Sequence, residues 1–596
     1  MAPVRLRTIL LVAAALVLVL LAAGVATPWS QVRHTLAHWT DEDDLREQIR
    51  GVGALTYLRL TQTAPRTDPF VPLRHSGLPP YGINTFLEQE ADVAQVERSL
   101  ELISQAGFRF IRQEFSWEDI EISAKGDTWD HQWNKSAWEK YDRIVELARA
   151  HGLHVIARLD NPPAWSRKVG NAPGWSMAPP DNLEDYGDFV YAVVSRYRGR
   201  VRHYQIWNEP NIYPEWGDQP VNPAGYVALL KLAYRRAKEA DPSCVIIAAG
   251  LAQTIEETPL EFGPRNMSDL LYLEKMYAAG VQGHFDVMGA QVYGLWTGPY
   301  DRRASRDRAN LARAQLLRDI MVRHGDADKP IWATEVGWNA LPPDFPAFPN
   351  YGRVTEERQA VYAIEAYQRA SSEWPWMGVM NYWFFRRPSE AERDQTWYYF
   401  RMMEPDMRPL PVYGALAWLM QQPPTVGIGH HQQDHWALHY EGQWQHLAPQ
   451  GAAPGEDSLA AYALGGAGDA LRFHFDGTDL ALVLRDAADS ARLRIEIDGR
   501  VRRPLLGAPS LLGAPSLRLG TLPASASGGP GVVVPVARLL PDGRHSATIT
   551  VAEGEVALDG LVVWRRSAAW APVGAGVAVL ALGALVHWLW AGRRRA

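Results

Sequence analysis

Cysteine is almost absent from this chain, whose 596 residues include a single one, Cys244. One thiol cannot close an intrachain disulfide, so thiol content does not identify the compartment in which the protein works. Cys244 lies in the apolar run 243–249, which has the pattern of a buried strand. No arrangement of histidine and asparagine marks it as a nucleophile, so we expect an inert, packed side chain.

The sequence also lacks the short motifs that hold nucleotides and metals. It contains no phosphate loop, no dinucleotide-binding fingerprint and no cluster with zinc-ligand spacing. In the histidine-rich run 429–439, His431, His435 and His439 are too far apart on a strand or loop to meet at one ion. No metal and no cofactor are therefore expected. The formal net charge is −7 and no basic block is present, which argues against a nucleic-acid partner.

Charge is missing from two long runs, one near each end of the chain. Residues 8–27 contain no charged side chain and follow Arg5 and Arg7, whereas residues 568–592 are mostly apolar and precede the arginines at 593–595. Each run is long enough to cross the hydrocarbon core of a bilayer. Basic residues at the outer end of both runs predict cytoplasmic termini and an extracytoplasmic chain between two membrane anchors.

The first apolar run has a second interpretation, as a signal peptide cut after Ala26, because Gly24 and Ala26 are small. The run is long for the apolar region of a signal peptide, which favours an uncut transmembrane anchor. Both interpretations place the protein at the cell membrane, with the long region between the two runs outside the cytoplasm.

The chain is long enough for several domains. Residues 30–80 have the pattern of a stalk: acidic residues after Thr40 suit the first turn of a short helix, and 61–80 is rich in proline, threonine and arginine. From 81 to 422, short apolar runs alternate with amphipathic stretches, as in repeated strand–helix units, and eight such units fit a (β/α)8 barrel of the TIM type. The predicted strands are 81–86, 108–115, 154–160, 203–209, 245–250, 285–293, 331–335 and 378–384.

After Met420 the helical pattern stops. Residues 425–566 contain alternating apolar and polar runs separated by glycine turns, which predict an antiparallel β-sandwich. The hexapeptide Leu-Leu-Gly-Ala-Pro-Ser occurs twice in tandem, at 505–510 and 511–516, and we place it in a loop because a core strand would not tolerate such an insertion. The sandwich is compatible with carbohydrate binding or with a spacer role.

Two glutamates stand at the ends of predicted strands that are far apart in the sequence. Glu209 closes the run 203–209 and Glu335 closes the run 331–335. A (β/α)8 barrel brings the carboxyl ends of all its strands to one face, so the two carboxyls are expected to meet there. Such a pair can cleave a glycosidic bond. The alternative, a salt-bridged residue of the barrel rim, explains the double placement less well.

Tryptophan is abundant, with 24 residues, and its flat apolar face matches the C–H face of a sugar ring. Core packing accounts for most of them. Five follow predicted strand ends, where a cleft would lie, although any one of them is equally compatible with a structural role: Trp117, Trp165, Trp216, Trp296 and Trp338.

Over about residues 80–420, this pattern resembles the retaining glycoside hydrolases of clan A. That clan carries its acid/base and its nucleophile on strands four and seven of the barrel, where Glu209 and Glu335 are predicted. Within the clan, the chain looks most similar to the β-xylosidase/α-iduronidase family. The segments that carry this similarity are 106–112, 115–117, 161–165 and 355–360.

The resemblance implies a general acid/base role for Glu209 and a nucleophilic role for Glu335. It also implies that Asn208 binds the sugar 2-hydroxyl at the transition state. In the retaining mechanism, the carboxyls stand about 5–5.5 Å apart, and the acid needs a higher pKa than the nucleophile. The substrate is then an oligo- or polysaccharide.

Three further residues are assigned by the same resemblance. Arg112 is similar to the arginine that pairs with the nucleophile, Tyr293 to the tyrosine that hydrogen-bonds it, and Trp383 to the platform beneath the sugar at the cleavage point. An ordinary ion pair, a packed tyrosine and a barrel-wall aromatic are the respective alternatives. The chain departs from a common clan pattern at Gln291, where many members have histidine.

Two rival functions remain compatible with the same residues. A catalytically silent barrel would bind polysaccharide or scaffold an assembly, but the retention of both glutamates with Asn208 speaks against it. A transglycosylase would use the same groups and differ only in whether a sugar or water reaches the glycosyl-enzyme.

Overall fold

The computed structural model describes residues 39–256, 265–447, 461–485, 491–502 and 531–566, with residues 33, 36, 37 and 263 and the pair 517–518. Within these residues, no helix is both long and apolar enough to cross a bilayer. The two predicted membrane runs, 8–27 and 568–592, and the tandem repeat at 505–516 lie outside them.

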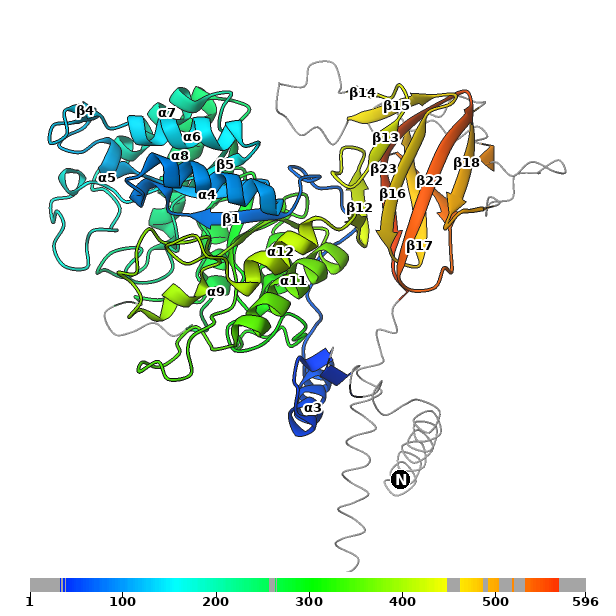
Figure 1. Ribbon diagram of the computed structural model, residues 1–596, viewed down its shortest axis with the longest axis horizontal. Helices are drawn as coiled ribbons and strands as arrows, with labels where there is room; N and C mark the ends of the chain where they lie inside the picture. Colours follow the sequence, from blue (N-terminus) through cyan, green and yellow to red (C-terminus); the bar gives the residue numbers. More distant parts are fainter. Residues whose placement is uncertain are drawn as a thin grey trace, which may run out of the picture.

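Eight parallel strands form a closed barrel, as predicted, and the helices around it lie beside the strands of the C-terminal region (Figure 1). The barrel strands are hydrogen-bonded in the order β7-β6-β5-β2-β1-β10-β9-β8, and bridges between Ile247 and Val287 and between Leu251 and Ala290 join the last strand to the first. The strands are β1 Tyr81–Thr85, β2 Phe110–Ser116, β5 His154–Asp160, β6 His203–Ile206, β7 Val245–Ala248, β8 Met288–Gln291, β9 Ile331–Val336 and β10 Met377–Tyr382.

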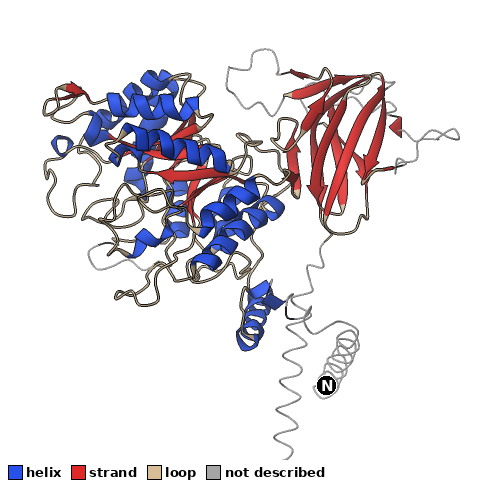
Figure 2. Cartoon of the chain, viewed as in Figure 1, coloured by secondary structure: helices blue, strands red, loops and turns tan. Residues whose placement is uncertain are grey.

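Helices surround the barrel and bury their apolar faces against it (Figure 2). Their starts follow from local sequence: the side chains of Asp92, Asn182, Asn222 and Thr355 each accept a backbone N–H of the first turn. These helices are α4 Val93–Ala106, α5 Trp117–Ile120, α6 Glu139–Ala150, α7 Leu183–Tyr197, α8 Pro223–Ala240, α9 Asp269–Ala278, α10 Ala314–Arg323, α11 Glu356–Glu373 and α12 Pro411–Met420. Short 3₁₀ turns lie at Leu87–Gln89, Ala164–Ser166, Leu311–Arg313 and Thr396–Phe400, and a small hairpin pairs β3 Trp129–Asp130 with β4 Lys135–Ser136.

The inside of the barrel is divided into an apolar floor and a polar layer above it. The floor is a cluster of buried side chains from five strands and the residue that precedes β8: Phe110, Ile156, Val245, Ile247, Val287, Trp332 and Val379. Residues two or more positions further along the same strands are buried and polar, among them Arg112, Asp160 and Glu335. The floor closes the lower end, so a ligand can enter only from the carboxyl ends of the strands.

The segment before the barrel is docked on it rather than extended as a free stalk. Helix α3, Leu45–Thr61, begins after Asp44, whose side chain accepts the backbone N–H groups of Arg46 and Glu47. Just before it, Asp41 accepts the backbone N–H of Tyr300 at 2.9 Å, and Glu42 accepts from Arg303 at 2.9 Å. These bonds tie the segment to the loop that follows β8.

The C-terminal region forms two sheets that pack face to face, as the sandwich prediction requires. One sheet contains β11 Thr425–Val426, β13 His439–Glu441, β16 Ala470–Asp476, β18 Arg492–Ile497, β19 Arg500–Val501, β20 Leu517–Arg518 and β22 Arg544–Glu553. The other contains β12 Gly429–Gln432, β14 Gln445–Leu447, β15 Tyr462–Gly466, β17 Asp479–Arg485, β21 Val532–Ala537 and β23 Glu555–Trp564. All pairs are antiparallel except β11 with β16.

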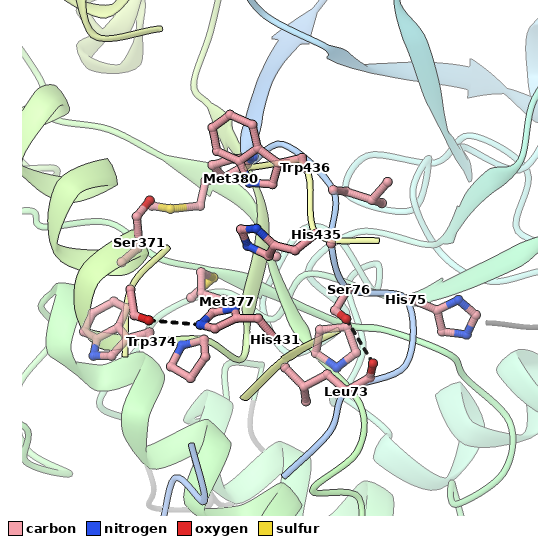
Figure 3. Close-up of a pocket in the computed structure, with 18 of the residues that line it drawn as sticks. Leu73, His75, Ser76, Ser371, Trp374, Met377, Met380, His431, His435 and Trp436 are labelled. Atoms are coloured by element: carbon pink, nitrogen blue, oxygen red, sulfur yellow. Dashed lines mark hydrogen bonds between the residues drawn. The ribbon is translucent and has the colours of Figure 1, made fainter. Parts of the chain in front are cut away.

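The sandwich contacts the closed, amino-terminal end of the barrel, and residues of both line a pocket there (Figure 3). The pocket is lined by Met377 and Met380 of β10, by His431 and by His435. The Nε2 atom of His431 is 3.0 Å from the carbonyl oxygen of Gly427, and the rings of His431 and His435 meet at 4.8 Å. The pocket therefore lies on the far side of the floor from the strand ends that carry the two glutamates.

Candidate active site

Glu335 lies in the polar layer of the barrel, at the carboxyl end of β9. Its Oε1 accepts a hydrogen bond from Arg112 Nη1 at 3.0 Å, and its Oε2 accepts one from the Tyr293 hydroxyl at 2.6 Å. Two donors, one of them cationic, stabilise the ionised form of this carboxyl. The structure thus brings together Glu335, Arg112 and Tyr293, which the sequence places on three different strands or strand ends.

The Arg112 guanidinium donates hydrogen bonds to three buried side chains besides Glu335. Its Nε donates to Gln205 Oε1, its Nη1 also donates to Asn84 Oδ1, and its Nη2 donates to Asn208 Oδ1, each at 2.7 Å. Asn208 is buried, and the acceptor bond fixes the orientation of its amide. Among the described residues, no acceptor is hydrogen-bonded to the Nδ2 group of Asn208, so that group can donate to a ligand.

Glu209 follows β6 through an unusual backbone. Trp207 has φ +71° and Glu209 has φ +37°, so the chain leaves the extended conformation after Ile206 and turns across the barrel mouth. Asn211 anchors the turn, because its amide donates to the carbonyl oxygens of Ala252 and Met267, each at 2.9 Å. This explains why β6 is shorter than the predicted strand 203–209.

The surroundings of Glu209 differ from those of Glu335. Burial raises the pKa of Glu209 well above its ordinary value, and the negative charges of Glu335 and Glu215 raise it further. No donor among the described residues is hydrogen-bonded to the Glu209 carboxyl. The two carboxyls therefore stand in different surroundings, which is the condition under which one of a pair can act as acid and the other as nucleophile.

Trp383 follows β10 and sits at the mouth of the barrel. Its backbone N–H donates to the carbonyl oxygen of Val336 at 2.9 Å, and its half-buried ring meets the ring of Phe86 edge-on at 5.5 Å. The residue is next to the strand that carries Glu335, which is compatible with the predicted platform.

Several residues of the site were not identified from the sequence. Asn84 and Gln205 orient Arg112, and their position on strands facing the barrel axis was the only available signal. A second charged group lies nearby: Arg158 forms ion pairs with Glu114 and with Asp160. Burial raises the pKa of Asp160, and burial with the charge of Glu114 raises the pKa of Glu88 to about 7.

Gln291 occupies the position where histidine is common in the clan. It is buried on β8, and its Cα is paired in register with that of Glu335. Among the described residues, neither its amide oxygen nor its amide nitrogen has a hydrogen-bond partner. The neutral amide leaves the charge of the site to the carboxyl and guanidinium groups.

The five tryptophans expected near the cleft differ in how far their side chains are exposed. Trp117, Trp216 and Trp338 are buried in the packing between strands and helices, and Trp165 is half-buried. Trp117 stacks on Phe189 at 5.3 Å, which identifies it as a core residue. Trp296 alone of the five is largely exposed, with 57 % of its surface accessible.

The remaining predicted features are structural. Cys244 is buried, and burial raises the pKa of its thiol to about 12, so it is not poised as a nucleophile. Across the described part of the chain, no three histidine, cysteine or acidic side chains are grouped as metal ligands.

Comparison with known proteins identifies the enzyme class of the barrel. Residues 75–367 match the model of the cellulase family, glycosyl hydrolase family 5. A curated relative, endo-1,4-beta-xylanase C from Paenibacillus barcinonensis, is 24 % identical over 228 residues, covering 33 % of this chain and 20 % of the relative. The chain spans about a fifth of the length of the curated relatives that it matches.

Two solved structures cover most of the chain. A family 39 glycoside hydrolase from the gut symbiont Bacteroides cellulosilyticus WH2 is 16 % identical, with 79 % of this chain and 80 % of that chain covered and a TM-score of 0.42. The family 39 enzyme from Xanthomonas axonopodis pv. citri is 15 % identical, with coverages of 83 % and 99 % and a TM-score of 0.42. The family-model match identifies residues 75–367 as a glycosyl hydrolase domain, an enzyme module that hydrolyses O-glycosyl bonds.

Proposed function

We propose that the protein is a retaining glycoside hydrolase that acts on an oligo- or polysaccharide by double displacement, with Glu335 as nucleophile and Glu209 as general acid/base. The observation that carries this proposal is the unequal environment of the two carboxyls. Glu335 receives hydrogen bonds from Arg112 and Tyr293, whereas burial and neighbouring charge raise the pKa of Glu209.

In the first step, a Glu335 oxygen attacks the anomeric carbon and the bond from that carbon to the leaving oxygen breaks. The Glu209 proton passes to that oxygen, so the leaving group departs neutral. In the second step, Glu209 takes a proton from water as the water oxygen attacks the same carbon. The ester bond to Glu335 then breaks, and the nucleophile is regenerated as a carboxylate. Asn208, oriented by Arg112, is placed to donate to a sugar hydroxyl, and Trp383 to support the ring.

The two carboxyl roles are separated by two variants. Glu335→Gln should abolish turnover and prevent covalent trapping by a 2-fluoro glycoside, because the nucleophile is lost. Glu209→Ala should spare aryl glycosides with good leaving groups more than natural glycans, and azide should restore its activity with formation of a glycosyl azide. Full activity in both variants, or no azide rescue, would contradict the roles.

We propose further that the chain is related to the β-xylosidase/α-iduronidase family within clan A. The support is the similarity of segments 106–112, 161–165 and 355–360, whereas the family model that matches residues 75–367 is that of family 5. Hydrolysis of aryl β-xyloside, β-glucoside, β-mannoside and α-iduronide distinguishes these alternatives. Activity confined to glucoside or mannoside would contradict the placement.

We also propose a location at the cell membrane with the barrel outside the cytoplasm. The support is in the sequence alone: uncharged runs at 8–27 and 568–592 with arginines on their outer flanks. Protease added to spheroplasts should digest the barrel, and protection of the barrel would contradict the location. N-terminal sequencing separates the uncut anchor from a signal peptide, because a mature chain that begins at Thr27 would exclude the double anchor.

A further inference from the structure

Two aromatic rings are exposed beside each other on loops that follow the adjacent barrel strands β8 and β9. Trp296, in the segment after β8, is 57 % exposed, and Phe348, in the segment after β9, is 71 % exposed. Their ring centroids are 5.9 Å apart. Rings of this size are normally buried, and segments that follow barrel strands lie on the catalytic face. The pair therefore needs an explanation other than core packing.

A row of aromatic contacts leads from the nucleophile toward this pair. Tyr293, which donates to Glu335, meets Phe400 at 5.5 Å, and Phe400 meets Tyr351 at 6.0 Å. Next to Tyr351, Gly352 has φ +76°, and a Cβ built on it would collide with the carbonyl oxygen of Leu295. The loops that carry Tyr351 and Trp296 thus touch, and the exposed rings are continuous with the catalytic site.

The side of the barrel mouth opposite these loops is charged. Strand β5 lies four positions from β9 in the eight-stranded order, and it carries Arg158 and Asp160. Arg158 pairs with Glu114 of the adjacent strand β2. The mouth therefore has a charged side suited to sugar hydroxyls and an aromatic side suited to the C–H face of a pyranose.

We infer that Trp296 and Phe348 form a subsite for a pyranose ring of the glycan on the leaving-group side of the cleaved bond. This inference rests on the proposed function. The ring contacts from Tyr293 through Phe400 to Tyr351 connect this side of the mouth to the catalytic carboxyls, and burial with the charges of Glu209 and Glu335 raises the pKa of Tyr351. A glycan whose chain continues past the cleaved bond would then be a better substrate than an aryl glycoside.

The same subsite would hold a sugar acceptor in the second step. An acceptor hydroxyl would lose its proton to Glu209 as its oxygen bonds to the anomeric carbon and the ester to Glu335 breaks. Water and acceptor compete for one intermediate, so occupancy of the aromatic subsite sets the fraction of transfer product.

The test uses the full chain with Trp296→Ala, Phe348→Ala and the double variant. Trp418→Ala is the matched control, because Trp418 is 54 % exposed on α12 and away from the strand ends. Substrates are xylohexaose, cellohexaose and mannohexaose with the dinitrophenyl glycoside of each sugar. The ratio of kcat/KM for the hexasaccharide to that for the aryl glycoside should fall about tenfold in each single variant, which corresponds to about 1.4 kcal/mol. Transfer to added acceptor should fall in parallel.

A binding experiment reads the subsite without turnover. Glu335→Gln protein should be retarded in native gels that contain xylan, hydroxyethylcellulose or glucomannan, and retardation should be lost when Trp296→Ala and Phe348→Ala are added. Equal mobility with and without these two substitutions in all three gels would overturn the subsite, as would an unchanged kcat/KM ratio. Absence of any Glu335-dependent hydrolysis would instead contradict the proposed function.

Discussion

Arg112 and Glu335 form a buried ion pair across the barrel, with 3.0 Å between Nη1 and Oε1 and side chains 2 % and 7 % exposed. Removing one partner leaves the other charge buried and uncompensated. Arg112→Met should lower the free energy of unfolding by about 3–5 kcal/mol and abolish most activity of the folded protein. The double variant Arg112→Met, Glu335→Gln should recover part of the stability but none of the activity.

The control for Arg112 is an equally buried pair away from the site. Arg313 and Asp269 are 2.7 Å apart, with side chains 0 % and 1 % exposed. Arg313→Met should cost a similar amount in urea unfolding while its folded fraction retains kcat. If both arginine variants lose the same share of activity per folded molecule, Arg112 has no role specific to the site.

Tyr293 offers a smaller perturbation of the same carboxyl. Its hydroxyl donates to Glu335 at 2.6 Å, and hydrogen bonds to charged groups contribute about 1.5–3 kcal/mol. Tyr293→Phe should therefore lower kcat by about tenfold to a hundredfold with little loss of stability. Tyr382→Phe is the matched control, since the buried Tyr382 hydroxyl has no partner among the described residues. Equal effects of the two substitutions on kcat would argue against a role for the Tyr293 bond.

The barrel and the position of Glu335 near the end of its strand were predictable because both depend on local sequence patterns. The eight strands lie where apolar runs alternate with amphipathic helices, and Glu335 lies at the end of its run. The end of β6 was placed too late, because the positive φ angles of Trp207 and Glu209 arise from the tertiary fold. No pattern in the sequence predicts such a turn.

Long-range contacts were the part that sequence could not supply. Asn84 and Gln205 orient Arg112 only because the barrel closes, and nothing near them in the sequence marks them. Trp117 follows a strand end but is buried against Phe189 of α7. The docking of Asp41 on Tyr300 likewise joins residues far apart in the chain, where linker composition indicated a free stalk.

The interface between the barrel floor and the sandwich should weaken in acid. Burial lowers the pKa of His431 to about 4, and burial with the charge of His431 lowers that of His435 further. His430, also of lowered pKa, faces the same pocket, and Asp559 opposes its shift. At pH values between the ordinary histidine pKa and the lowered ones, these histidines are protonated in the unfolded chain but neutral in the folded protein. The stabilisation is thus fully present above about pH 6.5, and as pH drops toward 4 it falls by up to about 1.4 kcal/mol per pH unit for each histidine of lowered pKa.

His431→Gln should remove the contribution of His431 to this acid loss, because glutamine can donate to the Gly427 carbonyl without titrating. Urea unfolding at pH 7 and at pH 4.5 measures the difference. His439→Gln, on the exposed edge of β13, should change neither value. The same loss of stability between the two pH values in wild type and His431→Gln would contradict the assignment.

The basic limb of the pH–activity profile should belong to Glu209. Its proton is needed for the first step, so kcat/KM falls as pH rises through the raised pKa of Glu209.

The charge of Glu215 is one cause of the raised pKa of Glu209. The pKa of Glu215 is itself raised to about 8, and burial is the largest cause. Removing a negative neighbour eases deprotonation of Glu209. Glu215→Gln should therefore move the basic limb to lower pH, by about one unit or less, while Glu146→Gln on the outer surface of α6 leaves it in place. Glu209 and Glu215 interact, so the basic limb of the wild type reflects the titration of both carboxyls. In Glu215→Gln, the limb reflects Glu209 without this neighbour. A limb that stays in place in Glu215→Gln, or moves to higher pH, would show that another group supplies the proton.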